Sequence, residues 1–322
     1  MRAYVTGGSG FVGSNVVEVF TRHLGADVFV PMHSWTPSVE AGYRWDSVDI
    51  LDPAVVRASV AAERPDVIVH CAILNDFDAM VADRRLAWSA YVESTRSLAL
   101  AANEVGAKLV LVSTDWVFDG TQSLADETTP PNPINLYGVL KLASELIALE
   151  VGSDVAVARV SGVNGVHWAR PASPRLQDRG FGYFVASLVD ALSAGLPFIV
   201  WDGPNVNMVA TPSLASECAF MIGRIVEHDR RGVFHCCGAE AVGRLELAER
   251  AAAAFELDAD LIACGPADPD LMAGVPVPVD TSLDASMTAE ALGIELAGLD
   301  PLLAEFRSQL ETGKISELGG RS

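Results

Sequence analysis

The segment NLYGVLK, residues 135–141, places a tyrosine and a lysine four positions apart. On a helix, Tyr137 and Lys141 project from one face about one turn apart. A phenol has an unperturbed pKa of about 10, roughly three units too high for easy proton transfer at neutral pH, and a nearby ammonium lowers this pKa by favouring the phenolate. We therefore predict that Tyr137 is a proton donor and that Lys141 makes it a usable one.

A hydroxyl group ahead of this pair is placed to hold a substrate oxygen. The segment KLVLVSTDWVF ends an expected buried strand with Ser113 and Thr114. A hydroxyl at the end of a central strand is suited to bind a substrate oxygen while a neighbouring acid transfers its proton. Tyr-x-x-x-Lys alone also occurs on ordinary exposed helices, so the prediction depends on the motifs around it.

A glycine-rich loop, TGGSGFVG, stands between an expected strand and an expected helix near the N-terminus. Glycines in this context permit a tight turn and let a pyrophosphate approach backbone N–H groups at the start of a helix, where the helix dipole favours anions. The loop predicts dinucleotide binding, and its expected contacts are Gly7, Gly10, Phe11, Val12 and Gly13.

The choice between NAD and NADP depends on the residues after the second expected strand, where a carboxylate would accept hydrogen bonds from the ribose 2′-OH. The segment VFVPMHSW has no carboxylate there and offers His33 and Ser34 as phosphate neighbours. NADP is therefore the expected cofactor, with NAD as the alternative. Asp49 and Ile50 could flank the adenine or simply end a strand. The remaining expected cofactor contacts are Cys71, Ala72 and Ser113.

The elements that must position these residues alternate short apolar strands with helices, which predicts a doubly wound parallel sheet of the Rossmann type. The expected strands are nearly all apolar, as strands covered on both faces should be. They span 3–6, 27–30, 66–71, 108–113 and 154–159, with a further strand near 47–50. The expected helices span 11–25, 53–63, about 80–105, and 136–150.

The pattern loosens after residue 159. We expect a cofactor domain over 1–160 and a smaller α/β substrate-binding domain over most of 161–322, with some later segments returning to the sheet. Residues 161–182 form an irregular stretch, of a kind that is often a binding lid. Cations gather in or beside it and could clamp a diphosphate, although an ordinary solvated loop is the alternative. They are Arg159, His167, Arg170, Arg175 and Arg179.

Composition narrows the class of protein. The 322 residues are 50% hydrophobic and carry a formal charge of −20, which disfavours nucleic acid and anionic membranes as partners. No apolar run is long enough to span a membrane, and no leader precedes the first strand, so a cytoplasmic protein is expected. The five cysteines have neither paired nor metal-ligand spacing, so we expect reduced thiols and no metal site.

Taken in order, these motifs resemble the extended short-chain dehydrogenase/reductases, and within them the dTDP-4-dehydrorhamnose reductase group. The resemblance spans nearly the whole chain and is most specific in STDWVFDG followed by NLYGVLKLASE. It implies that Thr114 polarises a substrate carbonyl, that Tyr137 donates the proton, and that Lys141 binds the nicotinamide ribose and lowers the phenol pKa. Asp115 and Trp116 would border the sugar, and a homodimer is common in related enzymes.

The chain also departs from this family. SAYVESTRSL places Tyr91 where the family commonly has an asparagine, and Tyr183 replaces a common asparagine before Phe184. We expect Tyr183, Arg170 and Arg175 among the substrate contacts.

The leading expectation is a reductase of a keto-sugar nucleotide, most simply a nucleoside-diphosphate 4-keto-6-deoxyhexose. A reductase of another small ketone or sugar position is the second reading. A non-catalytic dinucleotide-binding subunit, resembling the β-subunit of methionine adenosyltransferase, is the third.

Overall fold

The computed structural model describes residues 1–33, 42–74, 76–171, 176–178, 180–267 and 275–319. Among these residues, a seven-stranded sheet has the order β11-β6-β5-β4-β1-β2-β3, and each strand is parallel to its neighbours. The strands are β1 (Arg2–Thr6), β2 (Asp27–Met32), β3 (Arg44–Ser47), β4 (Val67–His70), β5 (Lys108–Thr114), β6 (Val155–Val160) and β11 (Gly232–Cys236). The predicted parallel doubly wound sheet is confirmed.

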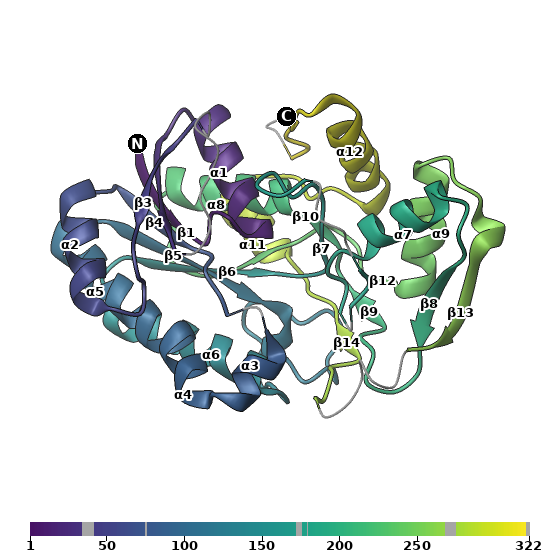
Figure 1. Cartoon of the computed structure of the whole chain (residues 1–322), viewed down its shortest axis with the longest axis horizontal. Helices are drawn as coiled ribbons and strands as arrows, with labels where there is room; N and C mark the ends of the chain where they lie inside the picture. The colour runs from purple at the N-terminus through teal and green to yellow at the C-terminus, as the bar shows by residue number, and fades with distance from the viewer. Residues whose placement is uncertain (34–41, 75, 172–175, 179, 268–274, 320–322) are drawn as a thin grey trace.

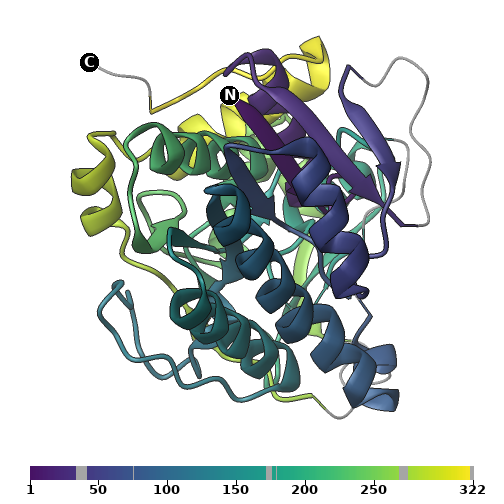
Figure 2. The ribbon, with the colours of Figure 1, turned by 90° about the vertical axis from the view of Figure 1, so that its left-hand side faces the viewer.

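Two layers of helices cover this sheet (Figure 1). One face carries α1 (Phe11–Arg22), α8 (Ala215–Glu227) and α11 (Ser286–Leu292), and the other carries α2 (Pro53–Glu63), α5 (Ser94–Val105) and α6 (Leu136–Val151). Figure 2 shows α2, α5 and α6 side by side. Successive residues of β1 serve both layers, since Tyr4 packs in the core under α2 and α5 and Val5 in the core under α1 and α8. This explains why the strands are apolar throughout.

The strand order reverses between β1 and β4, whose following loops therefore leave the sheet in different directions. A crevice at the carboxyl ends of such strands is the usual ligand site of an open α/β sheet. Gly7 follows β1 and Cys71 follows β4, so both predicted cofactor contacts lie at this point.

The long helix expected over 80–105 is interrupted, and that expectation was wrong in detail. The segment forms α3 (Phe77–Ala82), α4 (Arg84–Trp88), a π-helix η1 (Ser89–Glu93) and α5. Asp83 leaves the helical conformation and its carboxylate accepts hydrogen bonds from the N–H groups of Arg85 and Leu86, which starts α4 afresh. The strand expected near 47–50 is β3, which ends at Ser47.

The C-terminal part packs around a second core. Its helices are α7 (Phe184–Ser193), α9 (Arg244–Ala254) and α12 (Leu299–Thr312). Its short strands are β7 (Val163–Asn164), β8 (Phe198–Asp202), β9 (Val209–Ala210), β10 (Ser213–Leu214), β12 (Val242–Gly243), β13 (Ile262–Pro266) and β14 (Asp280–Thr281). Two 3-10 turns are η2 (Asp115–Val117) and η3 (Ala259–Leu261). α8 and β11 return to the main sheet, as expected of some later segments.

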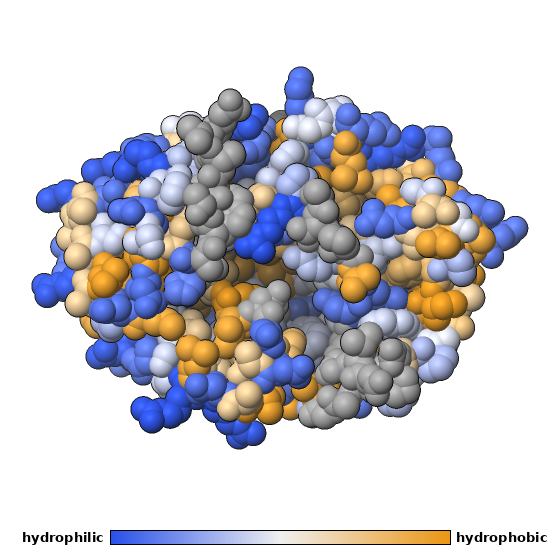
Figure 3. Space-filling view, viewed as in Figure 1, coloured by the Kyte–Doolittle hydropathy of each residue, from blue (hydrophilic) through white to orange (hydrophobic). Residues whose placement is uncertain are grey.

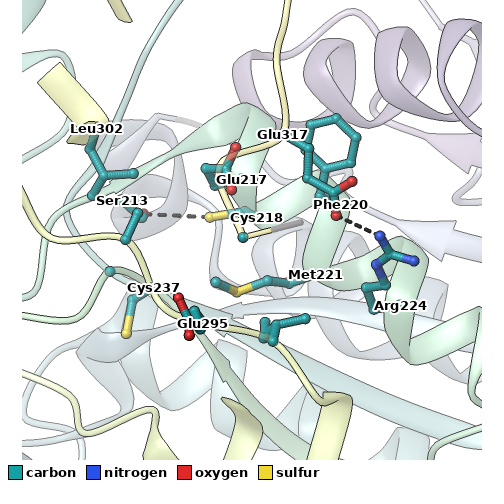
Figure 4. Close-up of a pocket in the computed structure, with 14 residues that line it drawn as sticks. Ser213, Glu217, Cys218, Phe220, Met221, Arg224, Cys237, Glu295, Leu302 and Glu317 are labelled. Carbon is teal, nitrogen blue, oxygen red and sulfur yellow. Dashed lines mark hydrogen bonds and ion pairs between the residues drawn. The ribbon is translucent and has the colours of Figure 1, made fainter. Parts of the chain in front are cut away.

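Two carboxylates, one buried and one partly exposed, hold the end of the described chain against α8. The Leu318 N–H donates to Glu217 Oε1 at 3.2 Å, and Arg224 pairs with Glu317 at 2.8 Å (Figure 4). Burial raises the pKa of Glu217 to about 7. The cavity beside these residues, lined also by Cys218, has a volume of about 20 Å³, which suits about one water molecule and no substrate.

Candidate active site

A cavity of about 980 Å³ opens at the carboxyl ends of β1, β4 and β5, where the main sheet meets the C-terminal part. Figure 3 shows this face of the molecule hollowed near its centre. A volume of this size accommodates a large ligand or two ligands side by side. Most of the residues predicted from the sequence line it, and they come from both halves of the chain.

The glycine loop forms one wall of the cavity, and all five of its predicted contacts line it. Gly7 has a φ of 67°, and a Cβ there would lie 2.6 Å from the Ala72 nitrogen. A Cβ on Gly13 would lie 2.1 Å from the Gly7 oxygen. Gly10 caps α1 without a side chain, so backbone N–H groups face the cavity at a helix N-terminus, where an anion is favoured. Cys71 and Ala72 line the same wall.

Thr114, Tyr137 and Lys141 meet in the cavity. Asn135 starts α6 by accepting the Gly138 N–H at 2.9 Å, and this cap aims the first turn, with Tyr137, at the end of β5. Thr114 is the side chain whose hydrogen bond with the Tyr137 phenol lowers the phenol pKa.

The expected effect of Lys141 on Tyr137 was wrong for this structure. Tyr137 is partly exposed to the cavity, but the protein atoms around it raise its pKa to about 12. The Lys141 ammonium donates instead to the Val112 carbonyl oxygen at 2.9 Å. Burial lowers the pKa of Lys141 to about 8. Desolvation of the phenolate, together with the charges of Asp115 and Asp178, therefore outweighs the Thr114 hydrogen bond that lowers the pKa of Tyr137.

Tyr91, from the family's asparagine position, packs between these two residues. Its ring is edge-on to the Tyr137 ring, with centroids 6.2 Å apart, and the Lys141 ammonium lies 5.6 Å above its centroid. The Tyr91 hydroxyl donates to the Leu74 carbonyl oxygen at 3.0 Å. The π-helix leaves the Tyr91 carbonyl oxygen to accept from Ser144 Oγ at 2.9 Å. The residue is 3% exposed and also belongs to the lining of the cavity.

Asp115 and Trp116 both line the cavity, as expected for neighbours of a substrate. Trp116 lies edge-on to Tyr137, with ring centroids 6.0 Å apart. Asp115 is turned inward, and its carboxylate accepts hydrogen bonds from three protein hydroxyl groups, those of Thr114, Ser161 and Thr281. Burial raises the pKa of Asp115 to about 6. Its carboxylate is thus held by three protein hydroxyl groups at the edge of the cavity, and the expected position of Asp115 beside a sugar stays a prediction.

Asp178 is a cavity residue that sequence reasoning missed. Its carboxylate accepts the backbone N–H groups of Gly180 and Gly182, and it is one of two carboxylates that raise the pKa of Tyr137. The residue is exposed, yet nearby protein atoms raise its own pKa to about 6. Arg244, 1% exposed, fixes this loop by donating to the carbonyl oxygen atoms of Asp178 at 2.9 Å and Gly180 at 2.6 Å. No local motif around Asp178 signals this position.

Several residues predicted to contact the cofactor lie outside the cavity or bond to other protein groups. His33 is exposed at the end of β2 and does not line the cavity, and Ser34 lies outside the described residues. Asp49 accepts the Leu51 N–H at 2.9 Å, and Ile50 packs against the core beneath α2. Ser113 lines the cavity, but its hydroxyl donates to Glu145.

The cations expected around a diphosphate are dispersed. Arg159 is 3% exposed and pairs with Glu145 at 2.7 Å, so it belongs to the core. Tyr183 and His167 stack near Phe11, with ring centroids 4.8 and 6.0 Å from it. Arg170, whose N–H donates to His167 Nδ1, lines the same part of the cavity. These side chains lie over the glycine loop rather than beside Tyr137.

Two of the expected cations, Arg175 and Arg179, fall outside the described residues. The part of the chain that the structure describes holds no cluster of three or more potential metal ligands. Within that same part, no helix has the length and apolarity needed to cross a membrane.

Residues 1–311 match the family described as the RmlD substrate binding domain. The β-subunit of methionine adenosyltransferase 2 from Xenopus laevis is 29% identical over 91% of this chain and 83% of that protein. A probable low-salt glycan biosynthesis reductase, Agl14, from Haloferax volcanii is 29% identical over 96% of this chain and all of that protein (100%). A dTDP-4-dehydrorhamnose reductase from Bacillus anthracis, solved in complex with NADP, superposes with a TM-score of 0.77 at 21% identity, covering 96% of this chain and 99% of that one. Because the family match takes in nearly the whole sequence, this chain belongs to the RmlD, or dTDP-4-dehydrorhamnose reductase, family.

Proposed function

We propose that the chain reduces a keto-sugar nucleotide with NADPH, most simply a nucleoside-diphosphate 4-keto-6-deoxyhexose, to the secondary alcohol. The observation that carries the proposal is the meeting of Tyr137, Lys141 and Thr114 in one cavity with the glycine loop. The chain's relatives include reductases of this family. NADH is the alternative reductant, since the NADP preference rests on the absence of a carboxylate directly after β2.

The residues present fit a dinucleotide. Gly7 and Gly13 pack so closely against neighbouring backbone that a Cβ at either position would clash, and the loop they form lines the cavity without side chains at Gly7, Gly10 and Gly13. Backbone N–H groups at the start of α1 would hold the pyrophosphate, and Arg170 also lines the cavity. When bound, the reduced nicotinamide supplies a hydride to the substrate carbonyl carbon. Residues 1–160 would then bind the cofactor, and most of 161–322 would cover the substrate.

Tyr137 supplies the proton in this proposal. With its pKa raised to about 12, the phenol is protonated at neutral pH and can donate to the ketone oxygen as negative charge develops there. Lys141, which lines the same cavity, would bind the nicotinamide ribose. Trp116 would face the sugar, whose ring it can cover with an apolar surface.

The test is a panel of dTDP-, UDP- and GDP-linked 4-keto sugars, with NADPH or NADH, followed by loss of reduced cofactor. Turnover of a keto-sugar nucleotide, with a lower Michaelis constant for NADPH than for NADH, is the expected result. Turnover of simple ketones alone would favour the second reading, a reductase of another small ketone. Faster use of NADH would overturn the cofactor assignment.

A second candidate function is a regulatory subunit that binds a dinucleotide without catalysis. The similarity to the β-subunit of methionine adenosyltransferase 2 favours it. Retention of Tyr137, Lys141 and Thr114 favours catalysis instead. Tight NADPH binding with no turnover of any sugar in the panel would support the regulatory reading and reject the reductase.

A further inference from the structure

Asp178 brings a carboxylate to the cavity from the C-terminal part of the chain. It begins the segment DRGFG, whose last glycine must be small, because a Cβ on Gly182 would lie 2.7 Å from Asp178 Oδ2. The backbone N–H groups of Gly180 and Gly182 donate to the carboxylate. An ionised carboxylate has about four lone-pair positions, and these N–H groups fill two of them. The residue is exposed, so a ligand in the cavity can reach its carboxylate.

Contacts that do not use this carboxylate fix its position. Arg244 donates to the backbone carbonyl oxygen of Asp178 at 2.9 Å. The side-chain amide of Gln177 donates to the Ile199 carbonyl oxygen at 2.8 Å and accepts the Trp201 N–H at 3.4 Å, which docks the preceding residue on β8. A carboxylate held in this way is preorganised, so little conformational entropy is lost when it binds a ligand.

Asp178 lies beside the group proposed to donate the proton. Its charge is one of the two carboxylate charges that raise the pKa of Tyr137. A Cβ on Gly180 would lie 3.6 Å from Asp178 Oδ1 and 3.2 Å from Trp116 Cζ2, so only a glycine separates the carboxylate from this ring. Trp116 in turn lies edge-on to Tyr137, with ring centroids 6.0 Å apart. A ketone whose oxygen meets the Tyr137 phenol therefore brings the substituents of its neighbouring carbons close to this carboxylate.

We propose that Asp178 is a specificity-determining residue that accepts a hydrogen bond from a hydroxyl group on the carbon next to the ketone, so that the substrate is an α-hydroxy ketone. This inference rests on the proposed reductase function and deepens it. In a nucleoside-diphosphate 4-keto-6-deoxyhexose the donor is the 3-hydroxyl, because the other neighbouring carbon bears only a methyl group and the ring oxygen, and neither can donate. With a pKa of about 6, Asp178 is mainly ionised at neutral pH and acts as an acceptor only.

The test pairs a change in the protein with the matching change in the substrate. Asp178→Ala removes the carboxylate and leaves the contacts of Arg244 and Gln177 in place. The second substrate is the 3-deoxy counterpart on the same nucleotide, which lacks only the proposed donor. A hydrogen bond to a charged group changes an affinity by about 10–100-fold. The native chain should therefore show a kcat/KM for the 3-hydroxy sugar about 10–100-fold above that for the 3-deoxy sugar, and Asp178→Ala should reduce this preference to about twofold or less.

This preference separates recognition from other effects of the charge. Loss of the carboxylate also changes the pKa of Tyr137, but that change acts on both substrates and cancels in their ratio. Phe77→Leu is the matched control, since Phe77 lines the same cavity with its ring 5.9 Å from that of Tyr137 and carries no hydrogen-bonding side-chain group. It should lower kcat/KM for both sugars and keep their ratio. A native chain that uses both sugars equally well, or a preference unchanged in Asp178→Ala, would overturn the proposal.

A binding measurement keeps this inference separate from the proposed function. Calorimetry with the NADP⁺-loaded protein gives dissociation constants for the 3-hydroxy and 3-deoxy forms of the product alcohol without turnover. The 3-hydroxy form should bind the native chain about 10–100-fold more tightly, and this difference should be lost in Asp178→Ala. If no keto sugar is reduced, the proposed function fails, yet this comparison still decides whether Asp178 recognises the hydroxyl. Equal affinities of the native chain for the two forms, or binding of neither, would refute the inference.

Discussion

Replacing Tyr91 by leucine should make the Lys141 ammonium easier to deprotonate. The ammonium lies 5.6 Å above the Tyr91 ring, in a buried setting that has already lowered its pKa to about 8. A desolvated cation–π contact stabilises the charged form by about 2 kcal/mol, and each pKa unit corresponds to about 1.36 kcal/mol. Loss of the ring should therefore lower the pKa of Lys141 by up to about 1.5 units, toward about 6.5.

The assay is a carbon-13 NMR titration of labelled lysine side chains. It is simple here because the chain has only three lysines, Lys108, Lys141 and Lys314. Tyr91→Phe is the matched control, since it keeps the ring and loses only the hydrogen bond to the Leu74 carbonyl. Its Lys141 titration should stay close to that of the native protein. If the Leu and Phe variants, both shown to be folded by thermal denaturation, titrate alike, the ring does not stabilise the charge.

Three further predictions concern the cofactor cradle and stability. Gly13→Ala places a Cβ only 2.1 Å from the Gly7 oxygen, so NADPH affinity measured by fluorescence titration should fall by at least about tenfold. Gly298→Ala, whose Cβ would meet only Glu240 Oε1 at 3.8 Å, is the control and should leave affinity unchanged. The pKa of Glu217 is raised from 4.5 to about 7, so its contribution to stability is present below about pH 4.5 and lost as pH rises through 7. Urea unfolding at pH 5 and 8 should show a difference of roughly 2.5 kcal/mol that Glu217→Gln removes. Glu145→Ala strands the buried Arg159 charge and should cost about 3–5 kcal/mol in the same assay, and a loss under about 1 kcal/mol would show the pair to be solvated.

The features that the sequence predicts correctly are those set by the local residue pattern and by the chemistry of neighbouring side chains. The apolar strands, the glycine loop before α1 and the order of Thr114, Tyr137 and Lys141 follow from periodicity and spacing, because a parallel sheet brings the carboxyl ends of its strands to one edge. Predicting these features does not require knowing which side chains from distant parts of the sequence come into contact.

What the sequence does not give depends on long-range packing. From the sequence, Arg159 was expected to lie beside a loop that could clamp a diphosphate. In the structure it forms a buried ion pair with Glu145 on α6. The pKa of Tyr137 reads as lowered by Lys141, but burial and two carboxylates raise it. Asp178 lies in an irregular stretch with no period, and contacts with Arg244, distant in the sequence, help to hold it at the cavity. The burial of an ionisable side chain and the identity of its distant partners cannot be inferred from the spacing of residues in the sequence.

The most direct test of the central claim is a transfer experiment with NADPH carrying deuterium at the transferable position of the nicotinamide. After incubation with a keto-sugar nucleotide, mass spectrometry should find the deuterium on the new alcohol carbon with the native chain. The label should be nearly absent with Tyr137→Phe, although that variant still binds NADPH. A native chain that binds both ligands yet transfers no deuterium, or a Tyr137→Phe variant that transfers it at the native rate, would contradict the account.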